Sequence, residues 1–265
     1  MRILITGAHG MLGSFLAGKL GQDCLGVDLP LVDIGDPSKV TALIEDYKPD
    51  VIVNAAAITD VDRCETHPAL ADHVHNRGVR VLAGTGIRLV TVSTDQVFSD
   101  GKGRLLVESD PVEPVNAYAL SKLRGERAAL ANPSNCVVRT CWLTGSSGMI
   151  PRMAHRLQKG ETVSAVADQT ACITILEHLA EVLITMAFDE SYRGLYHCVN
   201  PGPVTPFFIA CRLNQEIGIG RVVPVEWGSL SLPAKRPVWS AMGTERDISM
   251  PNFEEAMEIC LKKIL

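Results

Sequence analysis

The sequence of 265 residues predicts an α/β fold built on a doubly wound parallel sheet, and three observations lead to this prediction. Short apolar runs alternate with helical patterns throughout the first half of the chain. These runs are apolar at consecutive positions, as expected for parallel strands that are buried on both faces. A glycine-rich turn joins the first run to the first helical pattern, which is typical of such sheets.

The alternation can be followed element by element through the first half. Strands are expected at residues 3–6, 24–27, 51–53, 88–93 and 136–139. Helices are expected between them, at residues 11–20, 37–47, 68–83 and 117–130, where apolar residues recur with a helical period. Strands joined by helices are expected to run parallel, because each connection has to cross one face of the sheet.

The second half has a different pattern and predicts a small C-terminal α/β lobe. A long helix is expected at residues 172–188, followed by a strand at 195–199, a helix at 206–217 and an extended segment at 222–226. The last helix is expected at 252–263, where Pro251 supplies a start signal. Neither a repeat nor a low-complexity linker separates the halves. We therefore expect the sheet in residues 1–145 and the lobe in residues 146–265, with an interleaved boundary.

Composition argues against several classes of protein. The formal net charge of −5 argues against nucleic acid or an anionic membrane as a partner, because phosphate-binding surfaces are usually basic. The longest apolar stretch, residues 173–188, is interrupted by Glu177, His178 and Glu181. The sequence opens directly into a strand pattern without a separate leader, so we expect a cytoplasmic protein. The eight cysteines form no C-x-x-C pair and are expected to be reduced thiols rather than metal ligands.

The turn after the first strand carries the spacing G-x-x-G-x-x-G. Glycines at these positions permit a tight turn, a close approach of a pyrophosphate and packing of the helix on the strand. The start of the following helix adds free N–H groups and the positive end of its dipole. We expect a Rossmann-type dinucleotide site; an ordinary glycine-containing turn is the alternative. The expected contacts are Gly7, His9, Gly10, Met11, Leu12 and Gly13.

Residues after the second and third strands are expected to complete the cofactor site. Asp28 ends the second strand, where a carboxylate can accept from the adenosine ribose hydroxyls. No Lys or Arg follows before residue 36, so the sequence favours NADH over NADPH, although Asp28 could instead cap a turn before Pro30. Asp33 and Ile34 are expected near the adenine. Small residues after the third strand leave room for a flat cofactor: Asn54, Ala55, Ala56 and Ala57.

A YxxxK pentad, Tyr118 to Lys122, lies on the fourth predicted helix. Residues four apart share one helical face, so we expect the ammonium to lower the pKa of the phenol toward working pH. The tyrosine can then give a proton to a substrate carbonyl, while the lysine bonds the nicotinamide ribose. Ser93, Thr94 and Asp95 close the preceding strand, where a hydroxyl can bond the same carbonyl. The alternative is a surface pair without a catalytic role.

These residues carry a resemblance to the dTDP-4-dehydrorhamnose reductases, a family of extended short-chain dehydrogenases. Residues 93–98, STDQVF, resemble the family's STDYVF segment, and residues 116–126 are similar to its N-x-Y-x-x-[ST]-K-L-x-G-E stretch. Residues 54–65 resemble its NAAAxTxVDxxE block, and residues 139–142, RTCW, resemble its R-T-S-W. Further matches follow at residues 168–169, 236–240 and 251–253, in order along nearly the whole chain.

The resemblance implies a catalytic triad of Thr94, Tyr118 and Lys122. It also implies reduction of a 4-keto group on a nucleotide-linked 6-deoxysugar, with dTDP as the expected nucleotide, and it is compatible with a homodimer. For Trp142 and Arg236 the alternatives are a core aromatic and a solvated charge. The implied cofactor contacts on the catalytic side are Ser93, Tyr118 and Lys122, and the implied substrate contacts are Thr94, Asp95, Gln96, Trp142 and Arg236.

The sequence departs from the family pattern at two points. Gln96 stands where the family usually has tyrosine, beside the catalytic threonine, and the chain is shorter than expected. Both changes touch the surroundings of the cofactor and the substrate. Two other functions therefore stay open: reduction of another sugar or antibiotic-precursor carbonyl, and a cofactor-binding regulatory subunit without catalysis. The intact triad argues against the regulatory subunit.

Overall fold

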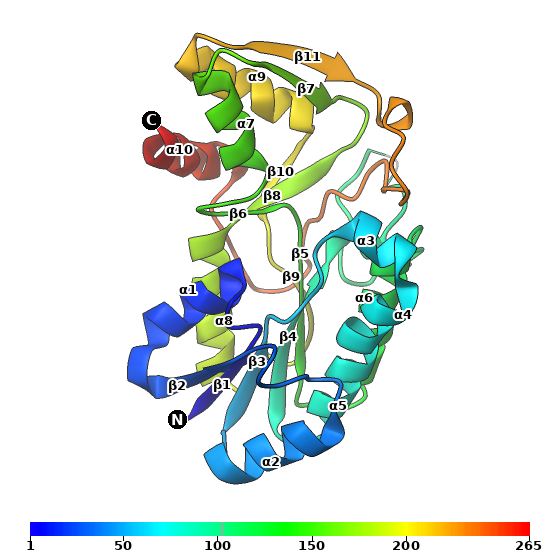
Figure 1. Cartoon of the computed structure of the whole chain (residues 1–265), viewed down its shortest axis with the longest axis vertical. Helices are drawn as coiled ribbons and strands as arrows, with labels where there is room; N and C mark the ends of the chain where they lie inside the picture. Colours follow the sequence, from blue (N-terminus) through cyan, green and yellow to red (C-terminus); the bar gives the residue numbers. More distant parts are fainter. Residues whose placement is uncertain (102) are drawn as a thin grey trace.

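Six parallel strands form the main sheet of the computed structural model, which describes residues 1–101 and 103–265 (Figure 1). Their order across the sheet is β2-β1-β3-β4-β5-β9. The direction of winding reverses between β1 and β3, and open α/β sheets bind ligands in the crevice beyond such a switch point. The strands are β1 (Ile3–Thr6), β2 (Cys24–Val27), β3 (Val51–Asn54), β4 (Arg88–Thr94), β5 (Cys136–Thr140) and β9 (Gly194–His197).

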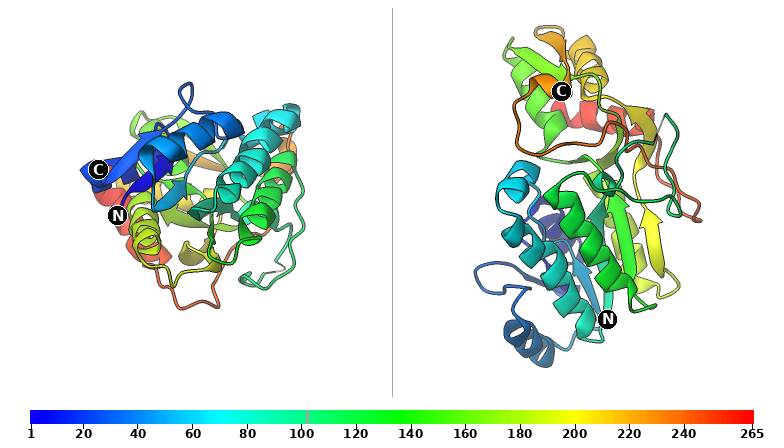
Figure 2. Two further views of the ribbon diagram at one scale, coloured as in Figure 1. Left: turned by 90° about the horizontal axis from the view of Figure 1, so that it is seen from below. Right: turned by 90° about the vertical axis from the view of Figure 1, so that its right-hand side faces the viewer.

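Helices cover both faces of this sheet (Figure 2). α1 (Met11–Leu20) and α8 (Leu176–Phe188) pack on one face, and α2 (Pro37–Tyr47), α5 (Val79–Gly84) and α6 (Ala117–Leu130) pack on the other. Ile3 and Ile5 belong to the core on the α1 side, whereas Leu4 belongs to the core on the α2 side. Both faces of the strands are therefore buried, which explains their continuous apolar runs. The predicted doubly wound fold is confirmed.

A smaller α/β lobe lies beyond the carboxyl ends of the strands, at the top of Figure 1. Its sheet has the order β10-β8-β6, and β11 pairs with β7 in a parallel ribbon. Three helices close its core with side chains such as Leu157, Leu213 and Met257. The strands are β6 (Leu143–Thr144), β7 (Thr162–Val166), β8 (Ala171–Ile175), β10 (Asn200–Val204) and β11 (Arg221–Val225), and the helices are α7 (Met149–Gln158), α9 (Pro206–Ile217) and α10 (Phe253–Ile264).

Segments of the main sheet and of the lobe alternate along the chain. α8 and β9 follow β8 in the sequence, yet α8 packs on the main sheet and β9 pairs with β5. Segment 238–243 runs beside the loop that follows β4, where the Leu106 N–H donates to the Ala241 carbonyl at 2.9 Å. Elements of the two parts thus alternate in the sequence, and a division near residue 145 stays a prediction.

Two predicted helices differ from the structure. The helix expected at residues 172–188 begins only at Leu176, because residues 171–175 form the fully buried strand β8. A short, continuous apolar run looks alike in a buried strand and a buried helix, so periodicity did not separate them. The helix expected at 68–83 consists of α4 (Pro68–Asp72), a π-helical segment (His73–Gly78) and α5. Such π-helical segments are frequent at functional sites.

Within residues 1–101 and 103–265, no helix is both long and apolar enough to span a membrane. In the same part of the chain, no three His, Cys, Asp or Glu side chains are grouped to hold a metal ion.

Candidate active site

The glycine-rich loop brings β1 and the start of α1 against the segment that follows β3. Gly7 has a φ of +75°, and a Cβ on it would lie 2.5 Å from the backbone nitrogen of Ala56. A Cβ on Gly13 would lie 2.1 Å from the Gly7 carbonyl oxygen. No side chain caps α1 at Gly10, so N–H groups of its first turn are available to a ligand. These features fit the pyrophosphate of a dinucleotide.

Asp28 holds this loop from the end of β2. Its carboxylate accepts the backbone N–H groups of His9 and Leu29, each at 2.8 Å. The side chain of His9 itself is 72% exposed. A cavity of about 140 Å³ lies beside the carboxylate, and we expect the adenosine of the cofactor to bind in it. The residues that line this cavity include Gly7, Gly10, Asp28, Asp33, Ile34, Ala55, Ala56 and Ala57.

Asp33 is bonded to its own surroundings within these walls. It accepts the Gly35 N–H at 2.8 Å and lies 3.0 Å from Nε2 of His73, on the π-helical segment. Burial raises the pKa of Asp33, but the hydrogen bonds from His73 and Gly35 outweigh burial and hold that pKa below its usual value. The carboxylate is therefore anionic at neutral pH, beside the place expected for an adenine.

Asn54 does not line this cavity but lies behind the residues that do. Its side-chain oxygen accepts from the Thr6 hydroxyl at 2.6 Å and from the Ala56 N–H at 3.2 Å. Its amide nitrogen donates to the Thr91 hydroxyl at 2.9 Å. Asn54 thus joins β1, β3 and β4 and fixes the turn that presents Ala55 and Ala57 to the crevice.

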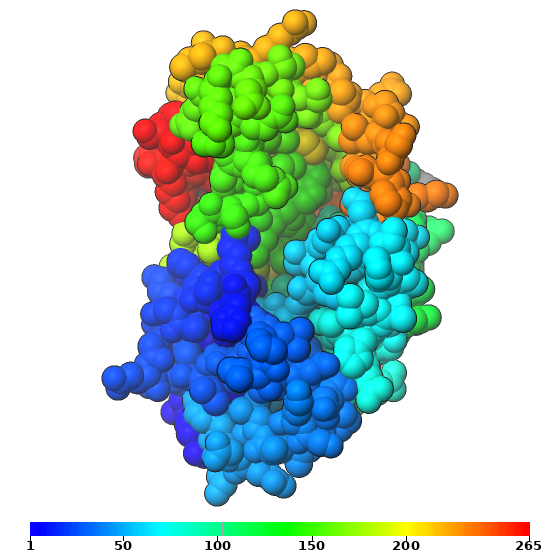
Figure 3. Space-filling model, in the orientation of Figure 1, coloured from blue at the N-terminus to red at the C-terminus, as the bar shows by residue number. Residues whose placement is uncertain are grey.

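A larger cavity of about 500 Å³ continues from the glycine-rich loop to the lobe. The surface is hollowed between the blue N-terminal segment and the cyan segment that carries α3 (Val61–Thr66) in Figure 3. Gly10, Met11 and Leu12 contribute to one wall. The opposite side carries residues expected to catalyse the reaction or to bind the cofactor and the substrate, namely Ser93, Thr94, Asp95, Gln96, Tyr118 and Lys122.

Helix α6 positions the tyrosine and the lysine. It begins at Asn116, whose side chain accepts the Ala119 N–H at 2.8 Å, and Glu65 on α3 accepts the Ala117 N–H at 2.8 Å. Tyr118 therefore lies in the first turn of α6 and Lys122 one turn later, as the pentad predicts. The ammonium of Lys122 donates to the carbonyl of Val92 on β4 at 2.6 Å. This bond fixes α6 against the strand that carries Thr94.

Burial dominates the electrostatics of this pair. It lowers the pKa of Lys122 to about 8, although the negative charge of Glu126 opposes the change. Burial also raises the pKa of Tyr118 well above its usual value, and hydrogen bonding by Thr94 offsets only part of the rise. The expected fall of the tyrosine pKa toward working pH is therefore wrong, because burial raises it instead. A phenol that stays protonated is the form that a proton donor needs.

Ser93 is tied to a buried ion pair beneath the cavity floor. Its hydroxyl donates to Glu126 on α6, and Glu126 pairs with Arg139 on β5 at 2.7 Å. The side chains of Glu126 and Arg139 are only 2% and 4% exposed. The Ser93 hydroxyl is thus occupied within the protein, and the pair holds β4, β5 and α6 in register below the reacting groups.

Trp142 and Gln96 both line the cavity. Trp142 follows β5 with a φ of +31°, a strained backbone conformation for a residue with a side chain. It is half-buried and packs on the lobe core while lining the cavity, and its contact with a substrate stays a prediction. The Gln96 amide oxygen accepts from Asn116 at 3.1 Å, which holds it beside the start of α6.

Arg236 is not among the residues that line this cavity. Its guanidinium pairs with Asp62 on α3 at 3.1 Å, donates to the Ala234 carbonyl at 2.8 Å and lies over the ring of Trp227. With its side chain 13% exposed, it is neither a solvated surface charge nor a lining residue. Its predicted contact with a substrate diphosphate stays a prediction.

Two residues of interest were missed at the sequence level. Arg152 on α7 is exposed and lines the cavity, and the structure gives it no ion-pair partner among the described residues. His75, 1% exposed, accepts the Ile58 N–H at 2.9 Å and contacts the Ser121 hydroxyl at 2.8 Å. Its ring lies edge-on to Tyr118, at 5.4 Å between centroids. No local motif marks either residue. His75 depends on partners distant in the sequence, and Arg152 lines a cavity whose other walls come from distant segments.

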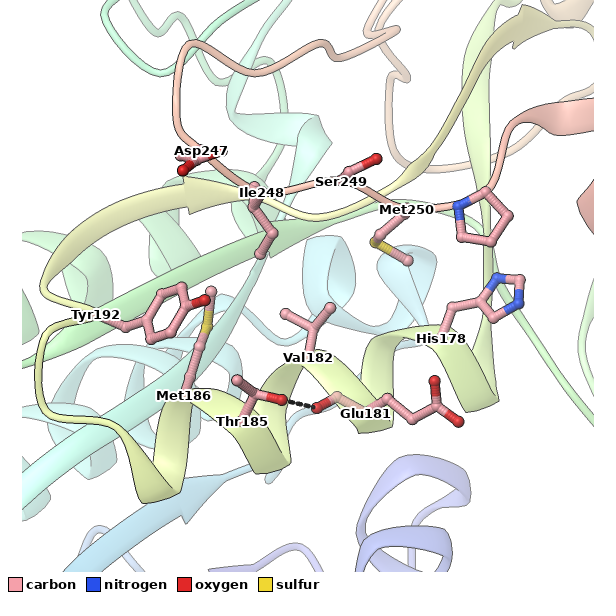
Figure 4. A pocket seen from close by; sticks show the side chains of 11 residues that line it. His178, Glu181, Val182, Thr185, Met186, Tyr192, Asp247, Ile248, Ser249 and Met250 are labelled. Atoms are coloured by element: carbon pink, nitrogen blue, oxygen red, sulfur yellow. Dashed lines mark hydrogen bonds between the residues drawn. The ribbon is translucent and has the colours of Figure 1, made fainter.

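A second hollow of about 440 Å³ lies between α8 and segment 247–251, away from the residues described above (Figure 4). Val182, Ile248 and Met250 point toward one another across it, and Glu181 and Asp247 stand at its rim. Carboxylates at the rim would repel the phosphates of a dinucleotide or a sugar nucleotide. The larger cavity at the ends of the strands is therefore the candidate active site.

The fold and this site together define a nicotinamide-dependent reductase of the extended short-chain dehydrogenase type. The glycine-rich loop fits a dinucleotide, and tyrosine, lysine and threonine meet in one cavity beside it.

The chain belongs to the family described as "RmlD substrate binding domain", whose model matches residues 1–265. It is 38% identical over 263 residues to a dTDP-4-dehydrorhamnose reductase from Mycobacterium tuberculosis, covering 92% of this chain and 86% of the relative. It is 32% identical to the Burkholderia thailandensis protein of the same name, covering 100% and 99% of the two chains. The Bacillus anthracis dTDP-4-dehydrorhamnose reductase in complex with NADP superposes with a TM-score of 0.92 at 29% identity, covering 99% of each chain.

Proposed function

We propose that this protein reduces the 4-keto group of a dTDP-linked 6-deoxysugar, using a nicotinamide dinucleotide as the reductant. The observation that carries the proposal is the single cavity that Thr94, Tyr118 and Lys122 share with the glycine-rich loop. The Mycobacterium tuberculosis and Burkholderia thailandensis relatives are named as reductases of dTDP-4-dehydrorhamnose, which supports the same substrate class here.

Each member of the triad has a distinct part in this reaction. A bound nicotinamide ring would supply the hydride for the carbonyl carbon. Tyr118 donates its phenolic proton to the carbonyl oxygen, and the Thr94 hydroxyl bonds the same oxygen as negative charge develops on it. Lys122, whose pKa of about 8 leaves it largely charged at pH 7, stabilises the phenolate that remains and would hold the nicotinamide ribose.

NADH is the reductant that we propose in preference to NADPH. Asp28 carries a negative charge beside the expected adenosine, and no Lys or Arg of the described chain lines that cavity. A 2′-phosphate would be repelled there without a compensating cation. The Bacillus anthracis relative is in complex with NADP, so the choice between the two cofactors is a property to measure for this chain.

The lobe side of the cavity is where we propose that the sugar nucleotide binds. Trp142 offers a flat surface, and Asp95 and Gln96 offer polar groups near the reacting carbonyl. Arg152 is the cation of the lining that suits a diphosphate, because guanidinium can donate two parallel hydrogen bonds. A contact from Arg236, a homodimer and a cytoplasmic location stay predictions of the sequence.

The decisive experiment follows the absorbance of the reduced cofactor after a dTDP-4-keto-6-deoxysugar is added to the purified protein. Oxidation of the cofactor with formation of the 4-hydroxy sugar is expected, and the corresponding free keto sugar should react much more slowly. Rapid reduction of the free sugar alone would favour a small-carbonyl reductase. Cofactor binding without turnover of any keto sugar would favour a regulatory subunit and contradict the proposal.

A further inference from the structure

The carboxyl of Asp95 lies directly behind the reacting groups. It follows Thr94 at the end of β4, lines the cavity and is 3% exposed. One oxygen, Oδ1, accepts the Thr94 hydroxyl at 3.2 Å. The other, Oδ2, accepts the hydroxyl of Ser240, which is 2% exposed and lies 145 positions further along the chain. Two hydroxyls thus donate to Asp95, besides the backbone N–H groups of Asp95 and Gln96, and it forms no ion pair with the cations that the structure describes.

These contacts limit what Thr94 can do. A hydroxyl has one hydrogen, and in this arrangement Thr94 donates it to Asp95. The Thr94 oxygen also accepts the backbone N–H of Gln96 at 3.2 Å. An ionised carboxylate can only accept, so it keeps the Thr94 hydrogen turned away from the cavity. In that state Thr94 has no hydrogen left for a substrate carbonyl.

Protonation of Asp95 reverses the direction of this bond. The carboxylic acid then donates from Oδ1 to the Thr94 oxygen, while Oδ2 continues to accept from Ser240. The Thr94 oxygen accepts from both Gln96 and Asp95, so its own hydrogen becomes free to point into the cavity, where Thr94 also forms a hydrogen bond with the Tyr118 hydroxyl. The charge of the group changes by one proton.

We propose that Asp95 is a positioning residue whose protonation sets whether Thr94 donates a hydrogen bond to the substrate carbonyl. The inference rests on the proposed function, because it assigns Thr94 to that carbonyl. Asp95 itself acts only through Thr94 and exchanges no proton with the substrate.

The surroundings of Asp95 favour its protonation within the pH range in which an enzyme can be assayed. Burial raises the pKa of Asp95 to about 6, although the bonds from Ser240 and Thr94 hold the rise in check. The titratable groups that interact with it are Tyr118 on α6, Cys141 after β5 and Cys172 on β8. Burial raises the pKa of both Tyr118 and Cys141, so these two groups are uncharged near pH 6. A hydrogen bond from Cys141 lowers the pKa of the Cys172 thiol, so the loss of the titration in Asp95→Asn is what assigns it to Asp95.

The test measures kcat/KM for the keto sugar between pH 5 and pH 8. In the wild type it should rise as the pH falls through about 6, changing about tenfold for each pH unit above that point. Asp95→Asn replaces the acid by an amide that donates to Thr94 and accepts from Ser240. This variant should lose the fall in kcat/KM above pH 6 and exceed the wild type at pH 7.5 by about tenfold or more. An unchanged fall above pH 6 in a folded Asp95→Asn protein would overturn the inference.

Ser240→Ala gives an independent measurement, because the Ser240 bond lowers the pKa of Asp95. Its loss should move the inflection to higher pH. Ser109→Ala is the matched control, since Ser109 donates to the carboxylate of Glu245 at 3.0 Å outside the cavity. An inflection that stays in place in Ser240→Ala, or moves equally in Ser109→Ala, would contradict the assignment.

A readout without substrate separates this inference from the proposed function. Infrared difference spectra of the protein alone should show a protonated carboxyl band that appears as the pH falls through about 6 and is missing in Asp95→Asn. A keto sugar that is not turned over by the wild type would refute the proposed function. A band that does not titrate, or that persists in Asp95→Asn, would refute the role of Asp95.

Discussion

Tyr118 combines a packed ring with a reactive oxygen, and a single substitution separates the two. Tyr118→Phe keeps the ring against His75 and in the cluster with Val61 and Cys64, but it removes the proton donor. We expect kcat to fall about 100- to 10,000-fold, with little change in the dissociation constant for the cofactor. Steady-state kinetics and cofactor titration check this. Tyr196→Phe, at a buried tyrosine on β9, is the matched control and should retain turnover.

The negative charge of Asp28 can be removed while one of its two acceptor oxygens is kept. The two carboxylate oxygens accept the N–H groups of His9 and Leu29, one each, and Asp28→Asn keeps an oxygen for one of them. Repulsion between two unit charges 4 Å apart amounts to about 1 kcal/mol in water and about 4 kcal/mol near a protein surface. The preference for NADH over NADPH should therefore fall about fivefold or more, measured as the ratio of the two kcat/KM values. A wild-type preference for NADPH that Asp28→Asn leaves unaltered would refute this role.

Substitutions of two arginines on different elements distinguish binding of the substrate from structural support of the site. Arg152 on α7 lines the cavity, whereas Arg236 joins its own segment to α3 through Asp62. Arg152→Ala should raise KM for the sugar nucleotide without altering cofactor affinity, because a charge-assisted hydrogen bond contributes about 1.5–3 kcal/mol.

Arg236→Ala is the matched comparison for Arg152→Ala. Its main effect should fall on thermal stability, because it leaves Asp62 without its partner. A rise in KM for Arg236→Ala, with no change for Arg152→Ala, would instead support the diphosphate contact expected from the sequence.

Elements set by local pattern were predictable, and elements set by distant contacts were not. The strands and helices around the glycine-rich loop follow from apolar periodicity, and the catalytic pentad lies on one helix. The sequence predicts helix where β8 begins the predicted range 172–188, because the buried residues 171–175 show no alternation of apolar and polar side chains. The short strand β6, only two residues long, offers no pattern at all. Its place depends on pairing with β8, which lies some thirty residues further along the chain.

The residues of the candidate site also fall into two groups, those marked by a local motif and those brought together by contacts distant in the sequence. Thr94, Tyr118, Lys122 and the glycines are marked by spacing within a few residues. Ser240, by contrast, meets Asp95 across 145 positions, and His75 meets Ser121 across 46. The direction of the Tyr118 pKa also depends on burial by the assembled structure, which the pentad alone does not reveal.

Stability of the whole molecule should depend on buried groups that titrate between pH 5 and 6.5. Burial lowers the pKa of His75 to about 3 and lowers that of His197. Both pKa values lie below that of an unfolded histidine, so each residue lowers the free energy of unfolding as the pH falls below about 6.5. For His75, which stays neutral in the folded state, the fall is about 1.4 kcal/mol per pH unit. The raised pKa of Asp95 acts in the opposite direction below pH 6, because the folded state then holds the extra proton.

Asp95→Asn removes the opposing contribution. Between pH 6 and pH 5 the free energy of unfolding of that variant should therefore fall more steeply than that of the wild type, by about 1.4 kcal/mol per pH unit. Urea denaturation at several pH values measures both slopes. Equal slopes in the two proteins would show that Asp95 does not titrate in this range.

The place of β9 at the edge of the main sheet has a consequence for synthesis on the ribosome. β5 is complete at residue 140, but its outer partner begins only at residue 194, about fifty residues later. At a typical elongation rate of about 5–20 residues per second, the edge of β5 stays bare for roughly 3 to 10 s. α8, which covers one face of the sheet, is also made within this interval. An unpaired, β-branched edge is a template for association with other chains. The nascent protein is therefore most exposed to aggregation while its lobe is being translated, and slower translation of that stretch lengthens the exposure.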